Sequence, residues 1–353
     1  MKIKILRPSQ LPSSWKGSVL GMDIETEDKY LDSPICLVSL YKPESNTAIV
    51  VPIKCYMSGR LVQISQFEME CLKDFLSGVR AVGHNLQFDL SMIKYQWGVK
   101  VEPYFDTFIF ARMMQFDKQG VKDIFIRIKQ ELSRMVNKFD SVVDGQQPPF
   151  VYNIDDKDVV RYSALDAVMP FHIMDYYREA IKKMIKICKI EMDYLSVASD
   201  MKANGLNFDL EKYQDLFAKY SMSVMSKQQD LNEYCGFNLR VNSTADLTKL
   251  LIDRLHLVTT VLTPKGAPSM NQESLGQMMD NCNDPEARSV LKQVMDLKHE
   301  FSVMNTTKKI PDYVIDDKLT FNIEQIGYDG IARVYCLTGD NKITLDGKVI
   351  TVK

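Results

Sequence analysis

The order of strand-like and helix-like patterns along the chain is the feature that constrains its fold most. Residues 17–53 hold short apolar runs separated by turn-forming residues, which predicts three antiparallel strands. From about residue 65 to 187, short buried runs alternate with segments of helical period, which predicts alternating strands and helices. From about 188 to 310 the pattern is almost wholly helical. These patterns indicate a mixed α/β sheet covered by helices, followed by a helical region.

Length and composition set further limits. A chain of 353 residues predicts two compact units, with the boundary near residue 188. The 44 basic and 46 acidic side chains give a net charge of -2, so any binding of DNA needs local basic strips or metal ions. The seven cysteines form no CxxC pair, which argues against a zinc site and for a reducing compartment. The sequence shows no signal peptide and no apolar run of bilayer length, so we expect a cytoplasmic protein.

Two acidic side chains stand close together on the first predicted strand. In "GMDIETE", Asp23 and Glu25 are two residues apart and therefore project from the same face of a strand. Met22 and Ile24 point to the opposite, buried face. Neighbouring acids repel each other, so the pair marks either the solvent face of an edge strand or a site that requires charge.

Two further motifs carry carboxylates. In "HNLQFD", Asp89 lies in the first turn of a predicted helix that Asn85 caps. There the helix dipole stabilises a carboxylate by roughly 0.3–1 kcal/mol, so capping alone is a sufficient explanation. In "YSALD", Tyr162 and Asp166 are four residues apart and share a helix face, where a surface hydrogen bond is the alternative to catalysis.

Together the motifs indicate a metal site. Carboxylates that converge with no basic residue beside them repel one another unless cations neutralise them. Oxygen ligands suit Mg²⁺ or Mn²⁺. Two such ions about 4 Å apart activate a water and stabilise the leaving oxygen of a phosphodiester.

The three motifs "DIETE", "HNLQFD" and "YSALD" resemble those of the DEDDy 3'-5' exonucleases, which have an RNase H-like fold. The resemblance implies that four carboxylates hold two divalent ions, Mg²⁺ or Mn²⁺: Asp23, Glu25, Asp89 and Asp166. It also implies that Tyr162 orients the attacking water. Three more residues fall at positions that contact the 3'-terminal nucleotides in this family: Thr26, Asn85 and Phe88, whose ring is expected to pack on sugar or base.

Two polar residues near these motifs have structural explanations. His84 is the one histidine close to the motifs in the sequence, and we expect it to have a structural role because the DEDDy pattern uses tyrosine. Asp106 begins a predicted helix, so we expect it to be an N-cap.

The helical half is similar to family A DNA polymerases. "IEMDYLSVASDMKANGLNFDLEKY" resembles the segment that follows their exonuclease domain. "TPKGAPSMNQESLGQMM" resembles a thumb loop, whose lysine and hydroxyls would contact the phosphates of a primer–template duplex. Ser302 departs from the pattern, which usually has lysine there. "KLTFNIEQIGYDGIARVY" resembles the antiparallel approach to the palm, with Ala332 in place of glycine.

The chain is therefore expected to divide into four parts. These are an exonuclease domain, a thumb-like DNA-binding domain, the start of a palm and a last segment: residues 1–187, 188–310, 311–335 and 336–353. The metal-binding aspartates of a palm and a fingers helix do not appear, so no polymerase activity is expected from this chain alone.

The last segment, "CLTGDNKITLDGKVITVK", resembles the opening block of an intein. The resemblance implies that the Cys336 thiol attacks the carbonyl of Tyr335 in an N-to-S acyl shift. The alternative is a plain hairpin, because "LDGK" suits a two-residue turn. No Thr-x-x-His block and no terminal His-Asn follow, so splicing requires a C-terminal partner chain in trans or a longer gene.

The sequence thus predicts the proofreading exonuclease and thumb portion of a family A DNA polymerase, from bacterial cytoplasm or from a phage in its host's cytoplasm. Its substrate would be the single-stranded or frayed 3' end of DNA. Two alternatives stay open: a stand-alone RNase D-like exonuclease that trims RNA, and a catalytically idle DNA-binding assembly subunit.

Overall fold

The computed structural model describes residues 1–129, 151–263 and 266–320, and the backbone of four later strands, 322–326, 332–335, 341–345 and 348–352. The chain forms two compact units. Unit 1 comprises Met1–Leu206 and Thr320–Tyr335, and unit 2 comprises Asn207–Leu319 and Cys336–Lys353. In the part of the chain that is described, no helix combines the length and the apolar character needed to cross a bilayer.

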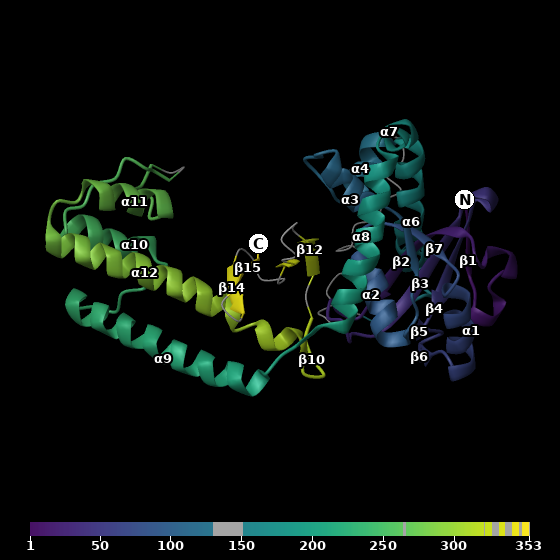
Figure 1. The fold of residues 1–353 in the computed structure, drawn as a ribbon, viewed down its shortest axis with the longest axis horizontal. Coiled ribbons are helices and arrows are strands. Elements are labelled where there is room, and N and C mark those ends of the chain that lie inside the picture. The colour runs from purple at the N-terminus through teal and green to yellow at the C-terminus, as the bar shows by residue number, and fades with distance from the viewer. Residues whose placement is uncertain are drawn as a thin grey trace. The chain divides into compact units, whose positions relative to one another are not determined.

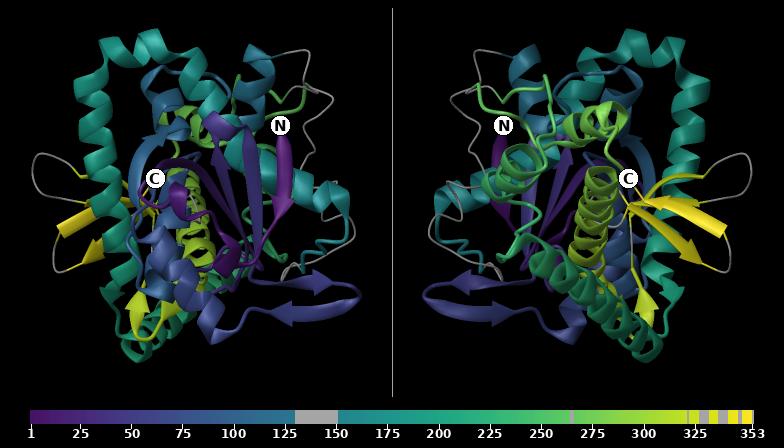
Figure 2. Two further views of the ribbon diagram at one scale, coloured as in Figure 1. Left: turned by 90° about the vertical axis from the view of Figure 1, so that its right-hand side faces the viewer. Right: turned by 90° about the vertical axis from the view of Figure 1, so that its left-hand side faces the viewer.

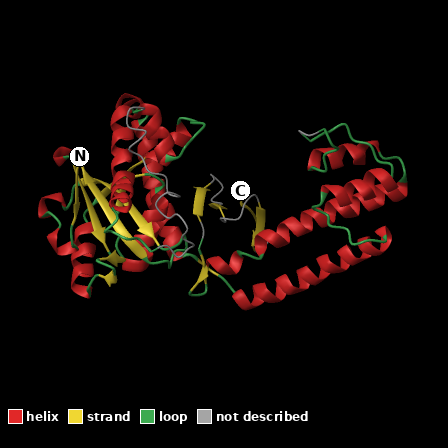
Figure 3. Ribbon diagram, turned by 180° about the vertical axis from the view of Figure 1, so that it is seen from behind, coloured by secondary structure: helices red, strands yellow, loops and turns green. Residues whose placement is uncertain are grey.

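Unit 1 is built on a six-stranded sheet in the order β1-β4-β3-β2-β7-β8. Its strands are among the yellow arrows of Figure 3. The strands are β1 (Lys2–Ile5), β2 (Val19–Thr26), β3 (Ile35–Lys42), β4 (Thr47–Pro52), β7 (Arg80–Gly83) and β8 (Glu102–Asp106). The pairs β2–β3 and β3–β4 are antiparallel, which confirms the predicted three-stranded arrangement. Strands β7 and β8 extend the sheet in parallel, and β1 pairs in parallel with β4. The predicted mixed α/β sheet is therefore confirmed.

The described helices of unit 1 are α1 (Gln66–Leu76), α2 (Leu86–Trp97), α3 (Thr107–Met113), α4 (Val121–Ile128), α6 (Lys157–Tyr176), α7 (Arg178–Lys183) and α8 (Ile185–Asn204). Of these, α2, α6 and α8 pack on strands of the sheet (Figure 1), whereas α4 packs on α6. Helix α6 contacts β2, β3, β4 and β7, whereas α2 contacts β2, β7, β8 and α8. The hairpin of β5 (Lys54–Met57) and β6 (Arg60–Gln63) is antiparallel (Figure 2). Strand β2, which carries the first motif, thus contacts both α6 and α2.

Helix α6 lies unusually close to β2. A Cβ atom added at Gly21 would stand 2.1 Å from the carbonyl oxygen of Ala167. The Ser39 and Ser163 hydroxyls, both buried, form a hydrogen bond of 2.7 Å between β3 and α6. Around these contacts a cluster of buried apolar residues fills the space between helix and sheet, including Leu37, Tyr41, Val50, Ala164 and Val168. The absence of a side chain at position 21 therefore allows α6 to rest on the strand.

The helical pattern does not break at residue 188, where the sequence predicts a boundary. Helix α8 runs without interruption through this position and packs against α2 and β8. Its buried residues include Cys188, Met192 and Leu195. Because these side chains join the packing of unit 1, the division between the units follows Leu206.

Unit 2 is helical. Its elements are α9 (Leu210–Cys235), α10 (Thr244–Leu247), the π-helix η5 (Thr248–Arg254), α11 (Gln272–Asn281) and α12 (Pro285–Thr307). Helices α9 and α12 pack together, and their core includes Val224, Leu231, Leu250, Leu291 and Val294. The short strands β10 (Val314–Ile315) and β11 (Lys318–Leu319) pair in antiparallel fashion.

Two strand pairs lie near the C-terminus. The pair β12 (Asn322–Ile326) and β13 (Ala332–Tyr335) is antiparallel, as the sequence predicts. The pair β14 (Asn341–Leu345) and β15 (Lys348–Val352) is also antiparallel and fits either reading of the last segment. Cys336 lies outside the described residues.

Candidate metal centre

Three of the four predicted metal ligands converge in unit 1. Asp23 and Glu25 project from the same face of β2, and Asp166 comes from α6, which lies across that strand. Each of these carboxylates places one oxygen within 4.8 Å of the other two. The close approach of α6 to β2 at Gly21 makes this convergence possible.

Two oxygens of this cluster lack hydrogen bonds. Glu25 Oε1 and Asp166 Oδ1 are buried and have no hydrogen-bond partner. The other oxygen of Glu25 accepts a hydrogen bond of 3.1 Å from the Tyr152 hydroxyl. An unpartnered buried carboxylate oxygen is costly, and a hard cation satisfies it. A set of ligands made only of carboxylate oxygens fits Mg²⁺ or Mn²⁺.

The electrostatics of the cluster lead to the same conclusion. Burial raises the pKa of Asp23 well above its ordinary value, and the nearby charges of Glu25, Asp89 and Asp166 raise it further. Burial and the charge of Asp166 likewise raise the pKa of Glu25. Ionisation of both groups is thus opposed in the protein alone, and a divalent cation would favour it.

Asp89 lies beside this cluster but is not one of the three converging residues. It is buried in the first turn of α2, and its Oδ1 accepts a hydrogen bond of 2.9 Å from the backbone N–H of Ile24. Burial raises the pKa of Asp89 to about 8. The hydrogen bond fixes Asp89 to β2 between Asp23 and Glu25, where its charge acts on Asp23.

Tyr162 lies one helical turn before Asp166 on α6. Its ring is buried, and this burial raises the pKa of the hydroxyl. A hydrogen bond from Tyr162 lowers the pKa of Asp166, against the larger effect of burial, which raises it. Tyr162 therefore keeps its proton at neutral pH and acts as a donor beside the carboxylates.

A lysine stands next to the acids, contrary to the assumption made from the sequence. Lys122 Nζ lies 3.4 Å from Asp166 Oδ2 and 3.8 Å from the centroid of the Tyr162 ring. The assumption that no basic residue lies beside the carboxylates is therefore wrong. Nothing in the local pattern around Lys122 indicates this position, because only the packing of α4 on α6 brings it there.

Comparison with known proteins places this geometry in a family. Residues 8–182 match the family model of the 3'-5' exonuclease of family A DNA polymerases. These residues form a 3'-5' exonuclease domain of the DNA polymerase I kind. The chain is 24% identical over 260 residues to DNA polymerase I of Borreliella burgdorferi and 20% identical over 276 residues to that of Aquifex aeolicus. These matches cover 72% and 74% of this chain, but only 28% and 46% of the two relatives.

The fold also resembles a solved structure over nearly all of its length. The POL domain of Pol1 from M. smegmatis, in complex with DNA primer-template and dNTP, has a TM-score of 0.63 and 13% sequence identity. The similarity covers 94% of this chain and 54% of that chain. At this identity the match shows the shared fold.

Two of the predicted nucleotide-contacting residues have defined partners in unit 1. Thr26 ends β2, and its hydroxyl donates a hydrogen bond of 2.7 Å to the carbonyl oxygen of Asp28. The ring of Phe88, in the first turn of α2, lies 5.3 Å from Lys202 Nζ. Neither residue is among the three converging acids, but Thr26 is next to Glu25 and Phe88 is next to Asp89.

Asn85, the third such residue, does not cap α2 with its side chain, so that prediction is wrong. It has a left-handed backbone conformation with φ of 62° and makes no side-chain capping bond. The carboxylate of Asp106 performs this function by accepting from the backbone N–H groups of Asn85 and Leu86, at 3.2 and 2.7 Å. Asp106 also caps α3, which confirms the prediction for that residue.

His84 has a structural environment. Its Nδ1 lies 2.9 Å from the Thr107 hydroxyl, which donates to the carbonyl oxygen of Gly83 at 3.1 Å. Because the hydroxyl proton is used in that bond, Nδ1–H of His84 donates to Thr107. Burial lowers the pKa of His84 to about 4, so the ring is neutral at pH 7. These contacts support the structural role predicted for His84.

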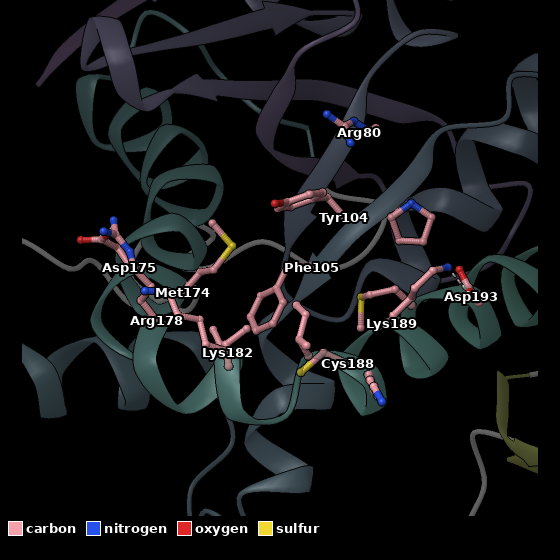
Figure 4. A pocket seen from close by; sticks show the side chains of 15 residues that line it. Arg80, Tyr104, Phe105, Met174, Asp175, Arg178, Lys182, Cys188, Lys189 and Asp193 are labelled. Carbon is pink, nitrogen blue, oxygen red and sulfur yellow. Dashed lines mark hydrogen bonds and ion pairs between the residues drawn. The ribbon is translucent and has the colours of Figure 1, made fainter.

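A cavity of about 750 Å³ lies elsewhere in unit 1, along β8, α7 and α8. Figure 4 shows Phe105, Met174 and Cys188 among its apolar lining, with Arg80 and Lys182 also in view. None of the five predicted catalytic residues lines this cavity. Its size therefore does not make it the catalytic site.

Proposed function

We propose that this chain removes nucleotides from the 3' end of DNA by hydrolysis with two divalent ions. The observation that carries the proposal is the cluster of Asp23, Glu25 and Asp166, in which buried oxygens of Glu25 and Asp166 have no hydrogen-bond partner. The cluster lies within the residues that match the exonuclease family model. Tyr162 and Asp89 complete the DEDDy set beside this cluster.

The proposed mechanism assigns a role to each residue. Four carboxylates would hold the ions: Asp23, Glu25, Asp166 and, from its place beside β2, Asp89. Bound Mg²⁺ or Mn²⁺ would supply charge for activating water and stabilising the leaving oxygen. Tyr162, which retains its proton, would orient the water by hydrogen bonding. The water loses a proton to solvent and its oxygen attacks phosphorus. The bond from phosphorus to the 3' oxygen of the preceding nucleotide breaks, and that oxygen takes up a proton, which yields a nucleoside monophosphate and a shortened strand with a 3'-hydroxyl.

The DNA contacts are proposed from position. Thr26, Asn85 and Phe88 would hold the 3'-terminal nucleotides, since each lies within one residue of a catalytic acid or at the start of its helix. Residues 207–310 of unit 2, most of the predicted thumb, would grip a primer–template duplex. The fold similarity to a polymerase solved with primer-template supports this role. A single-stranded or frayed 3' end would then be proofread in unit 1.

Digestion of matched DNA and RNA strands tests the proposal. We expect a 5'-labelled DNA strand to be shortened stepwise with Mg²⁺ or Mn²⁺, and not in excess chelator. The RNA strand should be cut at least about tenfold more slowly than the DNA strand, because a site built for deoxyribose disfavours the 2'-hydroxyl. Faster digestion of RNA would favour the RNase D-like alternative. Binding of duplex without digestion of either strand would favour the idle assembly subunit.

The sequence from Cys336 supports a second proposed activity, protein splicing with a partner chain. The Cys336 thiol would attack the carbonyl carbon of Tyr335, the amide C–N bond would break, and the released nitrogen would take up the thiol proton. A nucleophile of the partner would then capture the thioester and free the thiol again. The antiparallel pair β14–β15 follows this junction, as the opening strands of an intein would.

Co-expression tests the splicing proposal. A partner from the neighbouring open reading frames, carrying a C-terminal intein half fused to palm and fingers, is expected to give a longer ligated polymerase. Cys336→Ala should prevent ligation, because alanine has no nucleophile, whereas Cys71→Ala in α1 should leave the yield unchanged. Mass spectrometry of the product identifies the joined ends, and ligation that persists in Cys336→Ala would rule out this role.

A further inference from the structure

Helix α4 is held firmly against α6. Ile124 and Phe125 are buried in a cluster with Leu165, Met169 and Ile173 of α6. Lys122 is the second residue of α4, so this packing fixes the start of its side chain next to the part of α6 that bears Tyr162 and Asp166. The position of the lysine thus follows from a packed core and not from a mobile surface side chain.

The ammonium group of Lys122 contacts both functional residues of α6. It lies 3.4 Å from Asp166 Oδ2, and its distance of 3.8 Å from the ring centroid of Tyr162 is well inside the range of a cation–π interaction. Only 23% of the Lys122 side chain and 12% of the Asp166 side chain are exposed, so water screens the pair less than an ordinary surface ion pair. Within the described ranges, this is the one ion pair that any of the four predicted ligands forms.

The charge of Lys122 reaches the whole cluster. It lowers the pKa of Asp166, and also those of Asp23 and Glu25, against the larger effect of burial. The two oxygens of Asp166 are thereby divided: Oδ2 faces the ammonium group, and Oδ1 is buried without a partner. A divalent ion at Oδ1 would share this carboxylate with the ammonium group of Lys122, and the two positive charges would repel each other.

We propose that Lys122 is a positioning residue with two opposed effects. It holds the Tyr162 ring and the Asp166 carboxylate in the geometry that hydrolysis requires, and it weakens the binding of divalent ions through like charge. The inference rests on the proposed exonuclease function for its catalytic part only. The effect on ion binding belongs to the protein without substrate and is measured separately.

Two substitutions at this position separate charge from packing. Lys122→Met keeps the aliphatic stem and removes the charge, whereas Lys122→Arg keeps the charge and stacks on an aromatic face. For Lys122→Met we expect Mn²⁺ to bind about tenfold more tightly in calorimetry without DNA, measured at a pH high enough that the carboxylates are ionised in both proteins, because a unit charge several ångströms away is removed. For Lys122→Arg we expect the Mn²⁺ affinity to stay within about twofold of the unsubstituted protein.

The same variants are then compared in hydrolysis at saturating Mn²⁺. Lys122→Met should lower kcat about tenfold or more and leave KM for single-stranded DNA nearly unchanged, because the water-orienting tyrosine loses its support. Lys122→Arg should recover most of kcat. Lys118→Met, at an exposed position just before α4, is the matched control and should change neither quantity.

The outcomes distinguish the inference from its alternatives. A lysine that only stabilises α4 would give Lys122→Met a lower melting temperature, equal or weaker Mn²⁺ binding, and no recovery by arginine. Equal or weaker Mn²⁺ binding in Lys122→Met overturns the inference even if the unsubstituted protein digests DNA. If the protein binds Mn²⁺ but digests no nucleic acid, the proposed function and the catalytic role fail together. Tighter binding by Lys122→Met would then still support the electrostatic role.

Discussion

Combining Asp23→Asn with Glu25→Gln is expected to lower the rate of metal-dependent DNA digestion by about 10³-fold or more. Removing both charges takes away several kcal/mol of the ion-mediated stabilisation of the transition state, which corresponds to a factor of this size. Both side chains keep their size, so the effect reports on charge. Release of labelled mononucleotides from a single strand measures it, and digestion at the normal rate would refute the proposed site.

The folding of this double variant provides an internal control. Because the folded protein raises the pKa of Asp23 and Glu25, native stability is full at low pH and falls as pH rises above the ordinary carboxyl range. Amides do not titrate, so in chelator at pH 8 the variant should melt at a higher temperature than the unsubstituted protein. Added Mn²⁺ should stabilise the unsubstituted protein and not the variant. Glu44→Gln, on the exposed surface, should alter neither activity nor melting.

Gly21→Ala is expected to impair metal-dependent digestion of DNA without altering any functional side chain. The new methyl group would stand 2.1 Å from the Ala167 carbonyl oxygen and 3.0 Å from Tyr41 Cβ. Because neither contact can be relieved by turning a flexible side chain, α6 must move away from β2. Overpacking of this kind costs about 1–3 kcal/mol of unfolding free energy. A shift of about 1 Å in the helix that bears Tyr162 and Asp166 should lower kcat about 10²-fold.

Urea denaturation and DNA digestion of Gly21→Ala measure the two effects. Gly276→Ala is a suitable control, because Gly276 lies in α11 of unit 2 and an added Cβ there meets nothing within 4 Å. Alanine favours a helix over glycine by about 1 kcal/mol, so this control should be slightly stabilised and fully active. Normal stability and activity in Gly21→Ala would show that neither the folding of the protein nor its DNA digestion requires the close approach of α6 to β2.

Much of the fold could be predicted because local patterns coincide with the tertiary arrangement. The antiparallel order of β2, β3 and β4 follows from short turns between apolar runs, and α2 and α3 follow from helical periodicity after short strands. The parallel pairing of β1 with β4 was not predicted, since it joins segments distant in sequence. The packing of α8 on α2 was not predicted either, because no local sequence pattern indicates it.

The candidate site shows the same limit. Spacing indicates that Asp23 and Glu25 share a strand face, and the resemblance to the exonuclease motifs is what groups them with Asp166. In the structure these three side chains converge. Lys122 and Tyr152 could not be found in this way. Their approach to Asp166 and Glu25 depends on how α4 and the segment before α6 pack, and neither has a sequence spacing that relates it to the acids. Position alone also misassigned the cap of α2, which Asp106 provides from the end of another strand.

The chain passes between its two units more than once, since residues 320–335 return to unit 1 after unit 2 has been formed. A fragment that ends at residue 206 therefore omits part of the unit that contains the acids, including the β12–β13 pair. Weak digestion by such a fragment would reflect the missing part of unit 1 and would not locate the catalytic residues outside that unit. Deletion of the helical unit between residues 207 and 319, with the two flanking ends joined by a linker, is the dissection that leaves unit 1 whole.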